Sequence, residues 1–193
     1  MINPLLGRFF FRIRSLTPVP LYTLCLLSGT FDRINFYFGM TLILSGEILR
    51  LWAVGYLGIE SRTAEATAKE LVISGPYRVV RNPIYVGNIS IYTGFAVLSN
   101  IFFPYFQLLT MAFFAVIYVL IGRYEESFLL GRFGSSYSQY MESVRAFVPS
   151  APFAATSRAY SLQRAFLSER PTLLALAICL SGIFFRLFAW KAA

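Results

Sequence analysis

The chain alternates between long apolar runs and short polar stretches that are rich in turn-forming residues. Five runs stand out, at residues 16–29, 34–57, 84–99, 101–122 and 172–190. A membrane-spanning helix needs about 20 consecutive apolar residues, and four of the runs approach that length. The first is short, so we expect it either to tilt or to be extended by the preceding Phe9-Phe10-Phe11 cluster. The pattern predicts an all-α, polytopic transmembrane helical bundle of about five spans.

Asn100 is the whole link between the third and fourth runs, so these two must form an antiparallel helical hairpin. Polar segments flank the hairpin on both sides, at residues 71–87 (LVISGPYRVVRNPIYVG) and 123–149. Because a hairpin returns the chain to the side it left, we expect the two segments to lie next to each other. Gly75-Pro76 and Asn82-Pro83 break regular structure in the first segment. Irregular backbone at a membrane boundary is tolerated where it is buried in protein or lines a wet cavity, which predicts a site here.

The remaining segments frame this core within a single membrane domain of residues 1–193. Residues 1–15 predict a short interfacial helix; a signal peptide is the weaker alternative, because Pro18 and Pro20 interrupt the following run. Residues 58–70 predict a solvated amphipathic helix, and residues 150–170 an interfacial linker helix. The expected parts are residues 1–45, an N-terminal region; residues 46–149, the functional core; and residues 150–193, a linker with a C-terminal span.

Composition agrees with a membrane protein. The chain is 57% hydrophobic and 13% charged, whereas soluble domains average about 25% charged residues. The net charge of +8 comes from arginines and lysines at the ends of apolar runs, which favours topology signals over nucleic-acid binding. Placing the N-terminus and both polar segments in the cytoplasm puts nearly all of this positive charge on that side. We therefore expect an integral, multi-pass protein whose site faces the cytoplasm.

Several kinds of chemistry are excluded at this stage. The chain has no histidine, so a histidine general base is impossible and the commonest metal ligand is missing. Cys25 and Cys179 each lie alone within an apolar run, so neither a disulfide framework nor a paired-cysteine zinc site is expected. We predict no metal.

The two polar segments together bring a set of chemically useful side chains to one side of the bundle: Tyr77, Arg81, Asn82, Tyr85, Arg123, Glu125, Glu126, Tyr137 and Tyr140. Adjacent carboxylates suit a ligand that carries an ammonium group, and aromatic rings suit a cation or a nucleobase. The alternative is that Glu125 and Glu126 merely pair with Arg123 and Arg81. The residues alone leave both possibilities open.

Glu47 and Arg50 lie three residues apart within the second apolar run, and therefore on one face of the expected helix. Ionisable side chains inside a span are costly unless they are paired or face water. They form either an ion pair that neutralises itself or part of a cavity wall, and the sequence does not decide between these.

The pattern LV-x-x-GPY-x-x-x-RNP-x-Y-x-G, a hairpin, then EE and FG-x-x-Y-x-x-Y resembles the isoprenylcysteine carboxyl methyltransferase and phospholipid methyltransferase superfamily. The resemblance covers residues 46–149. It implies a membrane-embedded enzyme that uses S-adenosylmethionine as cofactor. The residues that it implies for cofactor binding are Leu71, Val72, Tyr77, Asn82, Pro83, Ile84, Tyr85 and Glu125, of which Glu125 would hold the amino-acid end.

Two positions depart from the superfamily pattern. Asn82 stands where the family has histidine, so a titrating group is lost although hydrogen bonding is kept. Ile121 stands where the prenylcysteine enzymes have an arginine that faces the substrate carboxylate, and Arg123 is two residues out of register. A carboxylate acceptor is disfavoured by the second departure.

The resemblance implies methyl transfer to a lipid-like or prenylated acceptor at the cytoplasmic face, with membrane lipids as surroundings. We assign Glu126, Tyr137 and Arg123 as candidate catalytic residues, and Glu47, Arg50 and Arg81 as candidate acceptor-binding residues. The alternatives are a membrane-embedded, NADPH-dependent reductase of the sterol type, with Arg78, Arg81 and Arg123 as the phosphate site, and a non-catalytic lipid-binding protein of the same fold.

Overall fold

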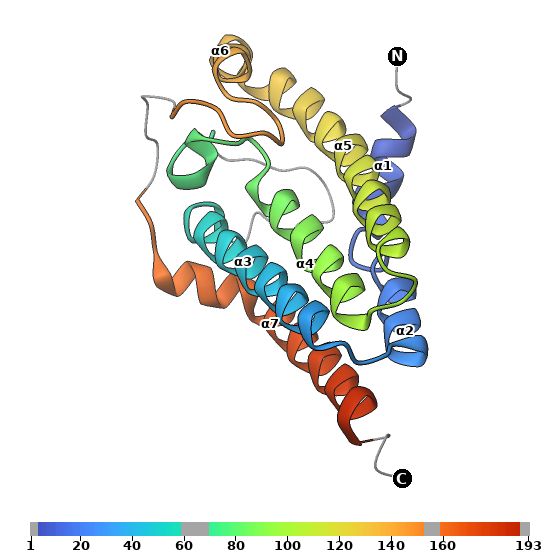
Figure 1. Cartoon of the computed structure of the whole chain (residues 1–193). Coiled ribbons are helices and arrows are strands. Elements are labelled where there is room, and N and C mark those ends of the chain that lie inside the picture. Colours follow the sequence, from blue (N-terminus) through green and yellow to red (C-terminus); the bar gives the residue numbers. More distant parts are fainter. Residues whose placement is uncertain (1–3, 59–69, 153–158, 190–193) are drawn as a thin grey trace.

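The computed structural model describes residues 4–58, 70–152 and 159–189. These parts contain seven α-helices and two short helical segments and no strand, so the predicted all-α class is confirmed (Figure 1). The elements in chain order are α1 (Pro4–Ile13), α2 (Val19–Ser28), α3 (Arg33–Leu57), η2 (Gly75–Arg78), α4 (Pro83–Ser99), α5 (Tyr105–Phe133), α6 (Ser135–Ser143), α7 (Leu162–Phe184) and η3 (Phe185–Ala189).

Helices α3 and α4 lie side by side at the centre of the bundle and touch through glycines (Figure 1). A Cβ atom added at Gly39 would lie 2.6 Å from the Gly94 carbonyl oxygen, and one at Gly46 would lie 2.6 Å from that of Gly87. No side chain fits at either crossing. Small residues allow this close approach in membranes, where packing replaces the hydrophobic effect as the force between helices.

Helices α4 and α5 form the predicted hairpin, and residues 100–104 make the turn. The bounds predicted for the fourth run, residues 101–122, are wrong at both ends. Helix α5 begins at Tyr105, directly after Pro104, and continues past the polar Glu125-Glu126 pair to Phe133. No helix breaker occurs until Gly134, whose φ of 51° is the left-handed conformation that ends the helix.

The N-terminal region forms a helix interrupted in its middle. Helix α1 packs on α5, where a Cβ atom at Gly7 would lie 2.6 Å from the Leu120 carbonyl oxygen. Helix α2 packs on α4, and the amide of Thr30 just beyond it donates to the Ser99 carbonyl at 2.9 Å. The two halves thus run along most of the hairpin, as Figure 1 shows. A helix is present at the N-terminus as predicted. The turn at residues 14–18 separates it from α2, so the Phe9-Phe10-Phe11 cluster does not extend the first apolar run within one helix.

Helix α7 corrects the prediction for the C-terminal region. Residues 150–170 were expected to be a separate linker helix, but α7 begins at Leu162 and passes without interruption through Pro171. Ser161 caps its start by accepting from the Arg164 amide at 3.3 Å. The Ser161 amide in turn donates to the Gly55 carbonyl at 3.1 Å, which fixes α7 against the end of α3.

Among the residues that the structure describes, three helical segments are long and apolar enough to cross a membrane, namely Arg33–Leu57, Tyr105–Phe133 and Leu162–Leu187. Helix α4 has 17 residues and α2 has 10, both shorter than a full span. The figure of five spans therefore stays a prediction. The amphipathic helix expected at residues 58–70 falls almost entirely outside the described residues.

A candidate active site between two polar segments and a tyrosine-lined cavity

The two polar segments that flank the hairpin lie against each other. The amide of Arg81 donates to the Arg145 carbonyl at 2.9 Å, and that of Asn82 donates to Ala146 at 3.1 Å. A third bond runs from the Ser150 amide to the Val79 carbonyl at 2.8 Å. The adjacency expected from the hairpin is thus confirmed, and the main chain itself holds the segments together.

Arg81 strengthens this junction through its side chain. Its guanidinium binds the Oε1 atom of Glu126 at 2.6 and 3.1 Å and also donates to the carbonyls of Met141 and Val144 at 3.0 and 2.5 Å. Pairing of Glu126 with Arg81, one of the two possibilities left open by the sequence, is therefore present. Both side chains are largely buried, so Arg81 is committed to closing the polar end of the bundle.

Glu125 has a different partner. The Tyr85 hydroxyl donates to its Oε2 atom at 2.8 Å, linking the start of α4 to α5. Arg123, which the sequence offered as a partner for the paired carboxylates, is exposed on α5. The Glu125 carboxyl group is thus oriented by a neutral hydrogen-bond donor, and it can accept a further hydrogen bond from a ligand.

The short helix η2 places Tyr77 beneath α6. Gly75 opens this turn with a φ of +60° and leaves no room for a Cβ atom, which would meet the Tyr56 ring. The Tyr140 hydroxyl donates to the Tyr77 carbonyl at 2.6 Å. Tyr77 is 7% exposed, and its own hydroxyl finds no hydrogen-bond partner within the described parts of the chain. A buried hydroxyl in this state marks a place where a ligand atom could complete the bonding.

The other predicted cofactor residues surround this turn. Leu71 packs on the cluster of Tyr137, Tyr140 and Val144, and Val72 packs with Tyr77 on the opposite side. The segment before η2 therefore lies between α6 and the end of α3.

Asn82, Pro83 and Ile84 form the start of α4. The Asn82 side-chain amide donates to the Ala146 carbonyl at 3.2 Å, so this side chain braces the junction of the two segments. Pro83 occupies the first turn of the helix, where its missing amide costs nothing. The predicted interruption of regular secondary structure at Asn82-Pro83 is confirmed.

Tyr137 and Tyr140 lie on α6 with ring centroids 5.8 Å apart. Burial raises the pKa of Tyr137 and of Tyr140 above the usual range, and it raises that of Tyr77 as well. All three phenols are therefore protonated at neutral pH. Tyr140 donates to the Tyr77 carbonyl, and the protonated hydroxyls of Tyr77 and Tyr137 can serve as donors rather than as bases.

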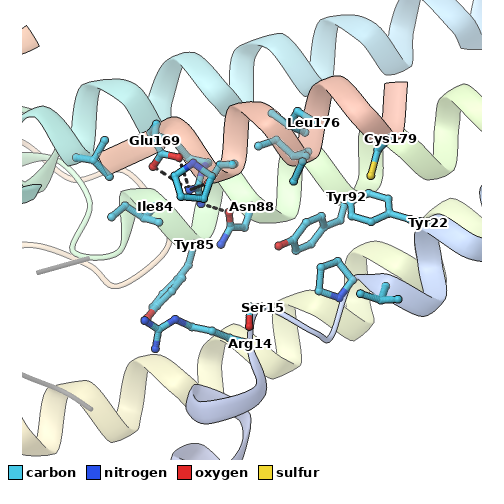
Figure 2. A pocket seen from close by; sticks show the side chains of 18 of the residues that line it. Arg14, Ser15, Tyr22, Ile84, Tyr85, Asn88, Tyr92, Glu169, Leu176 and Cys179 are labelled. Atoms are coloured by element: carbon cyan, nitrogen blue, oxygen red, sulfur yellow. Dashed lines mark hydrogen bonds and ion pairs between the residues drawn. The ribbon is translucent and has the colours of Figure 1, made fainter. Parts of the chain in front are cut away.

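A cavity of about 480 Å³ opens on the other side of Tyr85 (Figure 2). This volume falls in the range of roughly 300–1,000 Å³ that is typical of small-molecule sites. The residues that line it come from five helices and the α1–α2 break: Arg14, Ser15, Pro18, Val19, Tyr22, Arg50, Val54, Ile84, Tyr85, Asn88, Ile91, Tyr92, Tyr118, Glu169, Pro171, Thr172, Ala175, Leu176, Ile178 and Cys179. Figure 2 shows the Arg14 guanidinium near the hydroxyl end of Tyr85.

Arg50 forms the polar part of the cavity wall. Its Nη2 atom lies 2.9 Å from both carboxylate oxygens of Glu169 on α7, and its Nη1 atom donates to the Asn88 side-chain oxygen. Glu47 approaches the Arg50 Nε atom at 3.5 Å. The ion pair that the sequence offered as one possibility is therefore present, and of its two members Arg50 lines the cavity, whereas Glu47 does not. Arg81 is not among the lining residues.

Sequence reasoning missed the rest of this wall. Glu169 fell within the expected linker, although a single acidic residue directly before an apolar run is itself a signal for a buried partner. Asn88, Tyr92 and Tyr118 looked like ordinary residues of the hairpin. Only the orientation of each helix about its own axis, which the structure gives, shows that these three side chains face one cavity.

The structure thus defines a helical membrane protein in which a small-molecule cavity adjoins a polar junction at one end of the bundle. A comparison with protein families matches residues 34–136 to the family described as phospholipid methyltransferase. Because the match covers more than half of the chain, the chain belongs to the phospholipid methyltransferase family. No curated protein and no solved structure matches significantly.

Family membership confirms the resemblance found in the sequence and identifies an integral membrane protein of a methyltransferase family. The matched region contains α3, η2, α4 and α5. The α1–α2 break, α2 and α7 lie outside it, and yet they supply Arg14, Tyr22 and Glu169, respectively, to the cavity.

Proposed function

We propose that the protein transfers a methyl group from S-adenosylmethionine to a lipid-like acceptor held in the tyrosine-lined cavity. The observation that carries this proposal is the position of Tyr85. Its ring lines the cavity, while its hydroxyl binds Glu125 on the side of the polar segments. One residue therefore separates a pocket suited to an apolar acceptor from a carboxylate suited to an ammonium group.

The residues of the polar junction fit the cofactor's functional groups. Glu125 offers a carboxylate for the amino-acid end, and the unsatisfied Tyr77 hydroxyl offers a donor nearby. Leu71 and Val72 provide apolar contacts on either side of the same segment. When bound, S-adenosylmethionine supplies an already activated methyl group, so the protein's main tasks are alignment and exclusion of water.

The candidate catalytic residues divide by their surroundings. Tyr137 stays protonated and packs beside Leu71 outside the cavity, so it can donate a hydrogen bond on the side of the polar segments. Glu126 is held by Arg81, which limits it to shaping the site, and Arg123 is exposed to solvent or headgroups. We propose that the nucleophilic atom of the methyl acceptor reacts in its unprotonated form. Such an atom must be oriented toward the methyl group, and this matters more than a strong base that would remove a proton from it.

The site faces the cytoplasm in this proposal, because the polar segments carry the arginine-rich ends of the helices. The reductase alternative requires Arg78, Arg81 and Arg123 to form one phosphate site. Arg81 binds Glu126 instead, and Glu125 beside it would repel a phosphate. This arrangement supports the methyltransferase over the reductase.

Replacing Glu125 by Ala tests the proposal. We expect S-adenosylhomocysteine binding, measured by calorimetry on the detergent-solubilised chain, to weaken by about tenfold to a hundredfold, because a charge-assisted hydrogen bond contributes roughly 1.5–3 kcal/mol. Glu142→Ala, on the exposed face of α6, is the matched control and should bind as the wild type does. Unchanged binding in Glu125→Ala would remove this residue from the cofactor site.

A further inference from the structure

Helix α1 lies on the outside of the bundle, against α5 (Figure 1). Its inward face is made by Gly7 and Phe11, which are four residues apart and therefore lie on one side of the helix. A Cβ atom at Gly7 would lie 2.6 Å from the Leu120 carbonyl oxygen and 2.8 Å from the Tyr124 Cβ atom. The Phe11 ring is buried, and its centroid lies 5.5 Å from that of Tyr124. These contacts fix the rotation of α1 and so decide which of its residues face outward.

Two further pairs of residues, each four apart, occupy the outward side of α1. Leu5 and Phe9 form an apolar face, and their side chains are 69% and 56% exposed. Arg8 and Arg12 form a basic face, and both are exposed. Arg8 follows Leu5 by three residues and Arg12 follows Phe9 by three, so the two faces adjoin. Helix α1 therefore presents one face to the protein, one apolar face and one basic face.

The depth of α1 in the membrane follows from its contact with α5. Arg123 is the first charged residue of α5, after a long apolar stretch, so it marks the level at which this helix leaves the apolar layer. Arg123 is exposed, and it directly precedes Tyr124, which both Gly7 and Phe11 contact. Helix α1 thus crosses α5 at the level of the lipid headgroups, and Arg123 adds a third guanidinium beside its basic face.

The carboxylates of α5 are engaged elsewhere and leave this surface basic. Glu126 binds Arg81 in the polar junction, and Glu125 accepts a hydrogen bond from a tyrosine of α4. Among the residues that the structure describes, Arg8 and Arg123 form no salt bridge. Exposed positive charge at headgroup level, next to exposed apolar side chains, is complementary to a lipid with an anionic headgroup.

We infer that Leu5, Arg8, Phe9, Arg12 and Arg123 form a docking surface for anionic phospholipids of the surrounding bilayer. The acyl chains contact the apolar face, and the guanidinium groups bind the headgroup phosphate, for which their planar donor geometry is suited. Positive charge alone would serve as a topology signal, whereas an adjoining exposed apolar face is what a helix lying on lipid requires. The inference is independent of the proposed methyl transfer.

Such binding also acts on the cavity. Helix α1 ends at Ile13, and Arg14 and Ser15, which follow directly, line the cavity. A lipid that holds α1 against α5 therefore also holds this edge of the cavity in place.

The experiment compares two lipids on the full-length protein in detergent by native mass spectrometry. The probes are dioleoyl phosphatidylglycerol, which is anionic, and dioleoyl phosphatidylcholine, which has the same acyl chains and no net charge. We expect the wild type to prefer the anionic lipid. Arg8→Gln/Arg12→Gln should bind it about tenfold to thirtyfold more weakly, because each arginine near an anionic surface contributes about fivefold. Its affinity for phosphatidylcholine should not change.

The matched control is Arg132→Gln/Arg145→Gln, which removes the same charge from two exposed residues at the same end of the bundle. This variant should keep the wild-type preference. A loss as large as that in Arg8→Gln/Arg12→Gln would make the effect one of net charge and overturn the assignment to α1.

Two further measurements separate charge from apolar contact. Phe9→Ala should weaken the binding of both lipids by a similar factor and leave the preference intact, because the two lipids have the same acyl chains. Raising the salt concentration from about 0.1 M to 1 M should remove most of the wild-type preference, since the screening length falls from about 10 Å to 3 Å. The salt test needs no variant, so it stands even if a substituted chain fails to fold.

The outcomes that would overturn the inference are equally definite. They are equal affinity of the wild type for the two lipids, or a preference that survives in Arg8→Gln/Arg12→Gln or at high salt, since the lipid would then be bound elsewhere. Unchanged binding of both lipids in Phe9→Ala would remove the apolar face from the docking surface. Binding of S-adenosylhomocysteine, measured on the same samples, tests the proposed function separately, and Arg8→Gln/Arg12→Gln should leave it unchanged.

Discussion

Two arginine–glutamate pairs hold this bundle together, and they do so in different ways. Arg81 and Glu126 join the two polar segments, and Arg81 also binds two main-chain carbonyls there. Arg50 and Glu169 join α3 to α7 inside the bundle, where the Glu169 side chain is only 1% exposed. At the first pair, Arg81 has main-chain carbonyls as further hydrogen-bond acceptors besides Glu126. At the second pair, Arg50 has few other acceptors nearby that could replace Glu169. The same pair of residue types therefore stabilises a surface junction in one place and orients a cavity wall in the other.

The difference predicts unequal costs when a carboxylate or guanidinium is removed. The largest effect is expected for Glu169→Ala, because it leaves the Arg50 charge inside the bundle with Glu47 at 3.5 Å as the nearest remaining carboxylate. Breaking a buried pair costs about 3–5 kcal/mol. The measurement is reversible unfolding of the detergent-solubilised protein. Glu169→Gln, which keeps the side-chain volume and one acceptor oxygen for Arg50, should lose less.

A smaller effect is expected for Arg81→Ala. Glu126 lies nearer the surface, with a side-chain exposure of 15%, so water can solvate it once Arg81 is gone. The loss should be about 1.5–3 kcal/mol, the contribution of hydrogen bonds to a charged group. Amide exchange at Arg81 and Asn82 should also accelerate as the segments separate. A greater destabilisation than in Glu169→Ala would reverse the ranking of the two pairs.

The smallest effect is expected for Arg186→Ala near the C-terminal end of α7. Its Nη2 atom lies 3.4 Å from the Leu27 carbonyl in an exposed setting, a long and weak contact. The change in unfolding free energy should stay within about 0.5 kcal/mol. A substantial loss would mean that α7 is anchored mainly at this end, and that Glu169 serves the cavity more than the fold.

Part of this arrangement could be predicted from the sequence. The single polar residue between two apolar runs predicts the hairpin. Hydrogen bonds between residues 81–82 and 145–146 confirm that the two polar segments flanking it lie next to each other. Pairing of Arg81 with Glu126 was one of the stated alternatives. These successes concern contacts that the chain topology alone brings together.

The Arg50–Glu169 pair could not be predicted in the same way. Its members are 119 residues apart, and Glu169 fell within the predicted linker helix of residues 150–170, whereas α7 is in fact continuous from Leu162. Proline inside a membrane helix is tolerated because neighbouring groups satisfy the freed carbonyls. Asn88, Tyr92 and Tyr118 line the cavity together with Arg50 and Glu169 only because of how their helices are rotated, which no local pattern specifies.

The interruption between α1 and α2 has a consequence for biosynthesis. Helices α3, α5 and α7 are long and apolar enough to span a bilayer, whereas α2, with ten residues, is too short to do so. Pro18, Val19 and Tyr22, which α2 and its preceding turn bring to the cavity, therefore depend on partners that the ribosome synthesises later. We expect the N-terminal wall, although translated first, to be the last to dock, so that the cavity becomes complete only when the whole bundle has assembled.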